Sequence, residues 1–260
     1  MTDVLEIPAD WQPTPDLLAG RIILLTGAAH GIGRALATDM ATHGATLVLL
    51  DRDVPGLEAA YDDIVAAGHP EPALYPLDLQ GAAPQHYLEL ADTLQREFGR
   101  LDGLVNNAAE LGALVPIANT DTELWFKLLQ TDLHAPCLLT MACLKLLEAS
   151  ADASVIFTSD AVGRHGRAYW GAYGVAKAGL EGFMQILADE LESGGRIRVN
   201  SIDPGPVRTA LRTIAFPAEE RRTLPLPADV TLPFLYLVSA AARGITGRQL
   251  GTAADSTSRR

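Results

Sequence analysis

Short runs of apolar residues alternate with amphipathic stretches along most of this 260-residue chain. The apolar runs are continuous, which is typical of strands that are buried on both faces of a parallel sheet. We expect strands at 22–25, 45–50, 73–77, 101–105, around 155, at 197–202 and near Gln249. Helical patterns lie between them, at 34–44, 54–67, 85–98, 121–149, around 169–191, and at 228–241.

Repeated strand–helix–strand units predict one α/β domain, a single Rossmann-type doubly wound parallel sheet of about seven strands with helices on both faces. This domain is expected to cover residues 21–252. Residues 1–20 are polar and contain prolines, which predicts a leader packed loosely on the outside. The polar segment 210–227 is expected to be a mobile substrate lid, and residues 253–260 a frayed tail.

The longest helical pattern, 121–149, follows Thr120 and Glu123, which have the spacing of a capping box. Its apolar positions are too many for one face. We therefore expect this helix to pack both on the sheet and on a second subunit.

Composition narrows the class of protein. Hydrophobic content is 48% and charged content 20%, and no apolar run approaches the roughly 18 residues that span a bilayer. The N-terminus lacks the basic and apolar parts of a secretory signal, so a cytoplasmic protein is expected. Cys137 and Cys143 lie in one apolar helical pattern, which indicates reduced core thiols, and the scattered histidines predict no metal site. A formal charge of −12 disfavours nucleic acid and anionic membrane as partners.

The first strand ends in TGAAHGIG, residues 26–33, and a helix follows. Gly27, Gly31 and Gly33 allow a tight turn and a close approach of the backbone to a pyrophosphate. The free N–H groups and dipole of the helix N-terminus then attract that group. A turn with a purely structural role is the alternative.

Acidic residues follow the next two strands. Asp51 comes 18 residues after Gly33, where a carboxylate can bind the ribose hydroxyls of NAD and repel the extra phosphate of NADP. Arg52 could bind that phosphate instead, so NADP is the alternative cofactor. Asp78 is placed to reach an adenine amino group.

Tyr173 and Lys177 are four residues apart in the stretch YGVAK, on one face of a predicted helix. A nearby fixed cation favours the phenolate, so Tyr173 could act as an acid or base below its ordinary pKa of about 10. Tyrosine and lysine also occur at this spacing by chance, and their position after the cofactor-type turns is what favours chemistry.

The order of TGAAHGIG, Asp51, Asp78, NNAA, YGVAK and PGPVRT over residues 20–252 resembles the short-chain dehydrogenase/reductase family, most of all its YciK-like bacterial oxidoreductases. The resemblance implies hydride transfer between a nicotinamide cofactor and a small-molecule alcohol or carbonyl substrate. Tyr173 would be the general acid or base, and Lys177 would bind the nicotinamide ribose and stabilise the phenolate. A homodimer or homotetramer is also implied.

The resemblance further implies a set of cofactor contacts. They are Gly27, His30, Gly31, Ile32 and Gly33 at the pyrophosphate turn, Asp51 and Arg52 at the adenosine ribose, Asp78 and Leu79 at the adenine, Asn106 and Ala108 at the ribose side, Tyr173 and Lys177, and Pro204, Val207 and Thr209 at the carboxamide.

Three positions depart from the family pattern. Ala109 replaces a glycine of the usual NNAG. Asp132 stands where the family has a helix asparagine, and could keep a backbone contact and pair with Lys177. Asp160 stands 13 residues before Tyr173, where the family has a serine that hydrogen-bonds the substrate oxygen.

Asp160 is the most consequential departure. An ionised carboxylate donates no hydrogen bond and would raise the pKa of Tyr173. It could be kept protonated, or neutralised by Arg164 and Arg167. Ser159 should point to the opposite face of its strand and cannot replace the missing serine.

Three functions therefore remain open: an oxidoreductase in which Tyr173, Lys177, Asp160 and Asp132 form the catalytic group, a dinucleotide-binding sensor or partner subunit without turnover, and a Rossmann-type methyltransferase. Arg212, Arg221 and Arg222 of the lid, together with the adjacent Arg208, permit an anionic substrate, while a solvated lid surface is the alternative.

Overall fold

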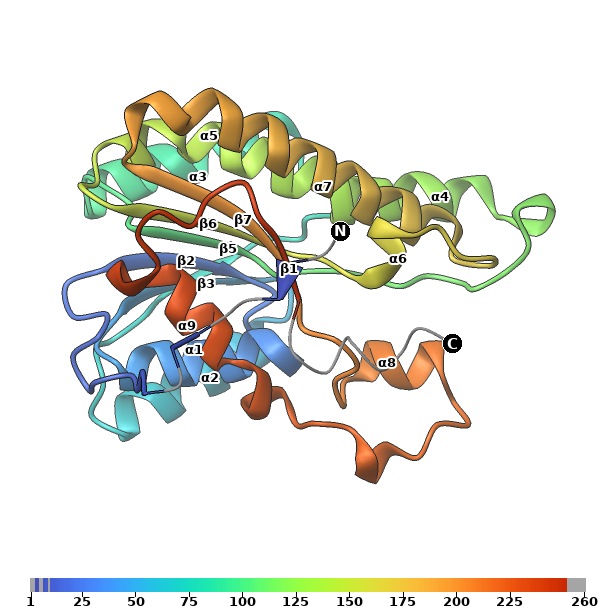
Figure 1. Cartoon of the computed structure of the whole chain (residues 1–260), viewed down its shortest axis with the longest axis horizontal. Helices are drawn as coiled ribbons and strands as arrows, with labels where there is room; N and C mark the ends of the chain where they lie inside the picture. The colour runs from blue at the N-terminus through green and yellow to red at the C-terminus, as the bar shows by residue number, and fades with distance from the viewer. Residues whose placement is uncertain (1–2, 5–6, 9, 252–260) are drawn as a thin grey trace.

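One parallel sheet organises the molecule (Figure 1). The computed structural model describes residues 3–4, 7–8 and 10–251. In this part of the chain eight parallel strands are paired in the order β1-β8-β7-β6-β5-β2-β3-β4. They are β1 (Asp3–Val4), β2 (Ile22–Thr26), β3 (Thr46–Asp51), β4 (Ala73–Pro76), β5 (Gly103–Asn106), β6 (Ala153–Thr158), β7 (Ile197–Asp203) and β8 (Gln249–Gly251). The predicted α/β sheet is confirmed, with β1 as one short strand more than expected.

Helices cover both faces of the sheet (Figure 1). One layer contains α3 (Pro84–Glu97), α4 (Thr122–Leu129), α5 (Ala135–Glu148) and α7 (Gly171–Leu191), and the other contains α1 (Gly31–Thr42), α2 (Val54–Ala66) and α9 (Leu232–Val238). The short helices α6 (Ala161–Arg164) and α8 (Ala210–Ala215) follow β6 and β7. No helix in the described ranges is long and apolar enough to cross a membrane.

The side chains of β2 show why the apolar runs are continuous. Ile22 and Leu24 belong to the core beneath α3, α5 and α7. Ile23 and Leu25 belong to the core on the side of α1, α2 and α9. Because successive side chains point to opposite faces and both faces are covered here, the first four residues of β2 are all apolar.

Within the leader, the described residues 10–20 pack against the domain, contrary to our expectation of loose packing. Leu18 is fully buried in the core beside α1. The Trp11 ring meets the Tyr236 ring edge to face, with the centroids 5.0 Å apart. These contacts bury apolar area and fix this part of the leader to the domain.

The predicted helix 121–149 is interrupted. A π-helical turn, Gln130–His134, separates α4 from α5. Pro136 follows this turn and has no N–H to bond the carbonyl four residues earlier, so a regular α-helix cannot continue through it. Asp132 lies in the turn, and the break therefore determines where this carboxylate points.

The cap of α4 also differs from the prediction. Asp121, not Thr120, is the N-cap, and its Oδ1 accepts hydrogen bonds from the N–H groups of Glu123 and Leu124 at 2.8 and 3.2 Å. Thr120 instead ends a preceding 3₁₀ turn. A carboxylate at the N-cap also complements the helix dipole.

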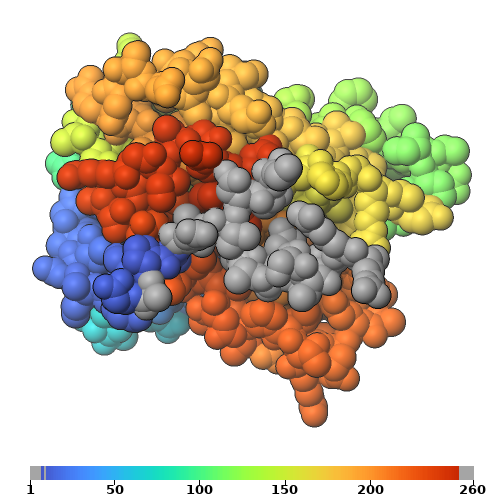
Figure 2. Space-filling view, viewed as in Figure 1, coloured from blue at the N-terminus to red at the C-terminus, as the bar shows by residue number. Residues whose placement is uncertain are grey.

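The predicted lid contains α8 and a 3₁₀ turn at Arg221–Thr223, and its mobility stays a prediction. In Figure 2 the orange segment that carries α8 forms the lower right part of the molecule. The predicted tail, 253–260, lies outside the described residues.

Gly33 is the point at which α1 packs most closely on the turn after β2. A Cβ added at Gly33 would lie 1.9 Å from the carbonyl oxygen of Gly27, so any side chain would displace the helix from the turn.

We predict that Gly33→Ala lowers the free energy of unfolding by about 3 kcal/mol or more, because the methyl group cannot be accommodated without backbone movement. Gly182→Ala is the matched control, since a Cβ there meets nothing within 4 Å and Gly182 lies inside α7. It should stabilise the protein by up to about 1 kcal/mol. Urea unfolding measures both, and equal effects of the two substitutions would contradict this packing.

Candidate active site

A cleft lies along the carboxyl edge of the sheet and has a volume of about 340 Å³. This volume falls at the lower end of the roughly 300–1,000 Å³ that is usual for small-molecule sites. Most of the predicted site residues line it: Gly27, His30, Gly31, Ile32, Asp51, Arg52, Asp78, Leu79, Ala108, Asp160, Tyr173, Lys177, Pro204, Val207 and Thr209. Segments from β2 to β7 thus meet in one place, as expected for the carboxyl ends of parallel strands.

The glycine-rich turn forms the floor of one half of the cleft. Gly27 and Gly31 have φ angles of 70° and 53°, in the region that favours glycine. A Cβ at Gly27 would lie 2.8 Å from the Cα of Ala108, so the turns after β2 and β5 are nearly in contact. The His30 side chain does not cap α1, and its Nε2 lies 2.6 Å from Asp53 Oδ2. The first N–H groups of α1 therefore remain available for an anion such as a pyrophosphate.

Two predicted cofactor residues do not line the cleft. Gly33 lies behind the turn, where its role is the close packing described above. The Asn106 side chain is buried and donates from Nδ2 to Thr140 Oγ1 at 3.1 Å. Asn107 lines the cleft instead, and its Nδ2 donates to the carbonyl oxygen of Thr26 at 3.2 Å. The sequence contains both asparagines, but strand alternation alone does not tell which of two neighbours faces the cleft.

Charged groups surround the end of the cleft beside β3. The Asp51 carboxylate accepts the N–H groups of Ala29 and Asp53 at 3.0 and 3.1 Å, which holds it against the glycine-rich turn. Arg52 Nη1 lies 2.5 Å from Glu110 Oε1 and 4.0 Å from Asp78 Oδ1. The charge of Arg52 is thus already compensated, and this end of the cleft is acidic overall.

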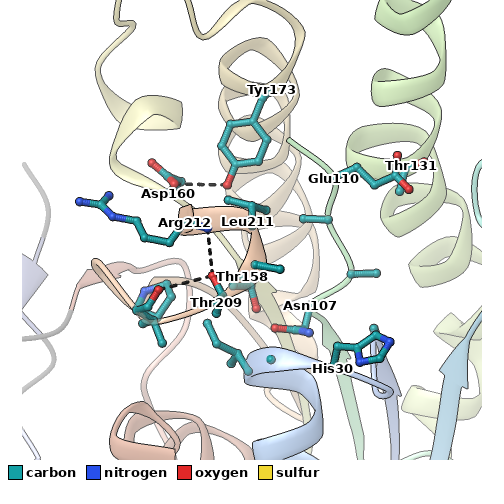
Figure 3. A pocket seen from close by; sticks show the side chains of 18 of the residues that line it. His30, Asn107, Glu110, Thr131, Thr158, Asp160, Tyr173, Thr209, Leu211 and Arg212 are labelled. Carbon is teal, nitrogen blue, oxygen red and sulfur yellow. Dashed lines mark hydrogen bonds between the residues drawn. The ribbon is translucent and has the colours of Figure 1, made fainter. Parts of the chain in front are cut away.

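Tyr173 and Lys177 face the other half of the cleft from α7. Both side chains are buried. The Tyr173 hydroxyl donates to Asp160 Oδ2 at 3.2 Å, as Figure 3 shows. Lys177 Nζ donates to the carbonyl oxygen of Thr158 at 3.0 Å and lies 5.4 Å from the centre of the Tyr173 ring.

The pKa of Tyr173 is raised well above its usual value of 10.0, first by burial and then by the charges of Asp160 and Asp132. The expectation that Lys177 would favour the phenolate is therefore wrong for this arrangement, because burial and the carboxylates outweigh the cation. Tyr173 is protonated at neutral pH and acts as a hydrogen-bond donor.

The surroundings of Asp160 test one of the two predicted rescues, neutralisation by the arginines of the following loop. Its Oδ1 accepts the N–H of Val162 at 3.0 Å, which caps α6. Arg164 does not neutralise it, because Arg164 Nε pairs with Glu181 Oε1 at 2.9 Å. Arg167 is exposed. Neutralisation by Arg164 is thus contradicted.

Ser159 points to the opposite face, as predicted. Its Oγ donates to Glu181 Oε1 at 2.6 Å, so the hydroxyl is bound beneath the cleft rather than directed at a substrate. Ser201 donates to the other oxygen of Glu181, also at 2.6 Å. Glu181 was not predicted from the sequence, because its partners come from segments 17 to 22 residues away.

Asp132 is almost completely buried in the π-helical turn and is not a lining residue of the cleft. Its Oδ1 accepts the N–H of Glu110 at 2.9 Å, which is the expected backbone contact, while Oδ2 has no hydrogen-bond partner in the described part of the chain. Burial raises the pKa of Asp132 to about 7, and the charge of Lys177 counteracts this increase only in part.

The sequence did not reveal the apolar wall beside Tyr173. Trp170, Leu211, Ala215 and Phe216 line the cleft there and come from the loop before α7 and from α8. The signal for this wall in the sequence is the presence of the apolar residues Leu211, Ala215 and Phe216 in an otherwise polar lid.

Comparison with known proteins identifies the family. The family model for short chain dehydrogenases matches residues 21–220. The chain belongs to the short chain dehydrogenase family. It is 41% identical to the uncharacterized oxidoreductase YciK of Escherichia coli K12 over 91% of this chain and 93% of the relative. The predicted family and subgroup are confirmed, and membership decides against the methyltransferase alternative.

Solved structures agree with this assignment. A short chain dehydrogenase from Pseudomonas syringae superposes with a TM-score of 0.91 at 46% identity, covering 93% of this chain and 98% of that one. A short chain dehydrogenase from Shigella flexneri 2a str. 301, complexed with NADP, superposes with a TM-score of 0.89 at 40% identity, covering 92% and 99%.

We predict that Asp132→Asn stabilises the protein more at pH 8 than at pH 4.5. The folded-state pKa of about 7 lies above the ordinary 3.8, so ionisation costs stability progressively as the pH rises between these values. Asparagine does not titrate. The gain should therefore grow over this range by up to about 4 kcal/mol and stay constant above it.

Urea unfolding at both pH values checks this prediction. Asp62→Asn, which removes an exposed carboxylate, is the matched control and should show no such growth. A gain from Asp132→Asn that is the same at both pH values would show that the buried carboxyl does not titrate as described.

Proposed function

We propose that this chain is a nicotinamide-dependent oxidoreductase that transfers hydride between the cofactor and an alcohol or carbonyl substrate, with Tyr173 as the acid or base. The observation that carries the proposal is the convergence of the glycine-rich turn and the buried Tyr173 and Lys177 on one cleft. When bound, the nicotinamide supplies or accepts the hydride.

Residues of the chain would bind the cofactor and donate the proton. The turn at Gly27–Gly31 and the N-terminus of α1 would bind the pyrophosphate, and Asp51 would bind the adenosine ribose. Pro204, Val207 and Thr209 also line the cleft and would hold the carboxamide. The hydrogen bond from Tyr173 to Asp160 is 3.2 Å long, which is weak for an O–H donor, so the hydroxyl can turn to a substrate.

A non-catalytic dinucleotide-binding protein is the second candidate. It is favoured by one observation, namely that the hydroxyl of Tyr173 is already bonded to a carboxylate that also raises its pKa. Binding of the cofactor without turnover on any alcohol, carbonyl or imine would support it.

We predict that Tyr173→Phe lowers turnover on alcohols and carbonyls at least about 100-fold, because the proton donor is lost. Cofactor affinity, measured by the change in protein fluorescence, should change little. Tyr169→Phe, which alters an exposed tyrosine four residues earlier, is the control and should retain turnover. Unchanged activity in Tyr173→Phe would remove this residue from the mechanism.

For the cofactor we propose NAD rather than NADP. The carboxylates of Asp51, Asp78 and Glu110 lie at the adenosine end, and Arg52 is already paired with Glu110. A further phosphate would therefore meet net negative charge. The related Shigella protein is complexed with NADP, which favours the alternative cofactor. The affinities of this chain for NADH and NADPH distinguish the two cofactors.

We predict that the wild-type protein binds NADH about tenfold or more tightly than NADPH, and that the double substitution Asp51→Ser and Glu110→Gln reverses the preference. Removing the Glu110 carboxylate frees Arg52 for the 2′-phosphate, and removing that of Asp51 relieves the repulsion of this phosphate. Asp62→Asn, on the exposed side of the neighbouring α2, should leave it unchanged. Tighter binding of NADPH by the wild-type protein would overturn the role given to Asp51.

We also propose that the protein is a homodimer or homotetramer, assembled through the layer of α4, α5 and α7. Large apolar side chains are exposed on these three helices, namely Phe126, Met141, Val175 and Ile186, of which Phe126 and Ile186 are 70% and 60% exposed. Apolar residues that share a helical layer in this way favour an interface between copies.

Light scattering should give the mass of at least two chains for the wild-type protein. Ile186→Glu should lower this mass, whereas Ile214→Glu is the matched control, because Ile214 is equally exposed but lies on α8 outside the layer. A monomeric wild-type protein would refute the interface.

A further inference from the structure

The region beside Tyr173 combines aromatic walls with a carboxylate. The Trp170 ring lies 5.7 Å from the Tyr173 ring and 5.9 Å from the Phe216 ring, measured between centroids. Leu211 and Ala215 complete this side of the cleft. Asp160 and the Tyr173 hydroxyl lie next to each other at the cleft (Figure 3). Aromatic rings and a negative group that line the same cleft are the features that bind organic cations.

The cations near this region do not compensate Asp160. Arg212 lines the cleft, but its guanidinium forms two bonds to Glu219, at 2.7 and 2.6 Å, and stacks on the Phe216 ring at 3.8 Å. Arg164 is paired with Glu181 beneath the cleft. Lys177 is directed to the carbonyl oxygen of Thr158.

Hydrogen-bond polarity points in the same direction. Both oxygens of Asp160 accept, one from Val162 N and one from the Tyr173 hydroxyl, so the only proton of that hydroxyl is directed at Asp160. Ser159, which could have donated, is bonded to Glu181. A substrate oxygen, which needs donors, would face a carboxylate, whereas a protonated nitrogen would donate to it.

We propose that this pocket takes a carbon–nitrogen double bond as a further substrate class, an aromatic or apolar imine bound as its iminium with the N–H directed at Asp160. The inference rests on the proposed function, which supplies the cofactor and the hydride. The bond that is reduced is C=N in place of C=O. Hydride from the reduced nicotinamide adds to the iminium carbon, and the electrons of the C=N π bond move onto nitrogen. The products are a neutral amine and the oxidised cofactor, and the amine then takes a proton from water.

Asp160 has opposite effects on the two substrate classes. Reduction of a carbonyl develops negative charge on oxygen, which a neighbouring carboxylate opposes. Reduction of an iminium begins with a positive charge that the same carboxylate stabilises. The raised pKa of Tyr173 is consistent with this division, since the phenol is then a weak acid for an alkoxide but an iminium needs no further proton.

Binding is tested first, without a cofactor, by calorimetry at pH 7. The probes are 1,2,3,4-tetrahydroisoquinoline, an ammonium ion at this pH, and 1-tetralol, which has a similar shape and no charge. The wild-type protein should bind the cation about tenfold or more tightly, as expected for a hydrogen bond to a charged group. Asp160→Asn should remove the preference while keeping the cap of α6, because asparagine caps equally well. Asp92→Asn, an exposed carboxylate on α3, is the control for net charge.

Turnover is tested next, with NADH and NADPH, on 3,4-dihydroisoquinoline and 1-tetralone. We expect the wild-type kcat/KM to favour the imine, and Asp160→Ser to lower imine reduction and raise ketone reduction at least tenfold.

The inference is overturned if the wild-type protein prefers the ketone, if the two binding probes bind equally, if the cation fails to bind up to millimolar concentration, or if Asp160→Asn keeps the preference. Ketone reduction alone would leave the proposed function intact, whereas failure to bind either nicotinamide cofactor would contradict the proposed function itself.

Discussion

The reversal of the sheet between β2 and β5 is the constraint on which the site depends. The chain builds β2, β3 and β4 toward one edge and then returns to build β5, β6, β7 and β8 toward the other. The turns after β2 and β5 consequently separate above two neighbouring strands, and a cleft opens between the segments that follow them. The contact of Gly27 with Ala108 shows how close these turns lie at its base, and it excludes side chains there.

Beside this cleft, Asp160 and its neighbour Ser159 form hydrogen bonds with different elements of the fold. Asp160 caps α6 and accepts from Tyr173, and the neighbouring Ser159 donates to Glu181 on the other side of β6. Glu181 in turn pairs with Arg164, whose Nη2 donates to the carbonyl oxygen of Leu250 in β8. The position of α6, and with it the carboxylate at the cleft, is therefore determined by a buried polar network that connects β6, β7, β8 and α7.

The fold and most lining residues could be predicted because they depend on local pattern: continuous apolar runs mark the strands, and functional residues follow strand ends. Other features depend on which face of its element a side chain points to, or on how deeply it is buried. The choice between Asn106 and Asn107 requires knowing which neighbour faces the cleft. The pairing of Arg164 with Glu181 requires the packing of α6 on α7. The raised pKa of Tyr173 arises mainly from burial, which no spacing reveals. Pro136 is different, because a proline inside a predicted helix is itself a sequence signal for the interruption of 121–149.

The central claim is that a nicotinamide cofactor lies across this cleft with its reactive end at Tyr173, beside a carboxylate that faces the substrate. A crystal structure of the protein with NADH tests this claim most directly. We expect the adenosine at Asp51, the pyrophosphate on the N-terminus of α1, and the nicotinamide between Tyr173 and the Pro204–Val207 segment. A cofactor bound in the opposite direction, or outside the cleft, would contradict the roles assigned to both halves of the site.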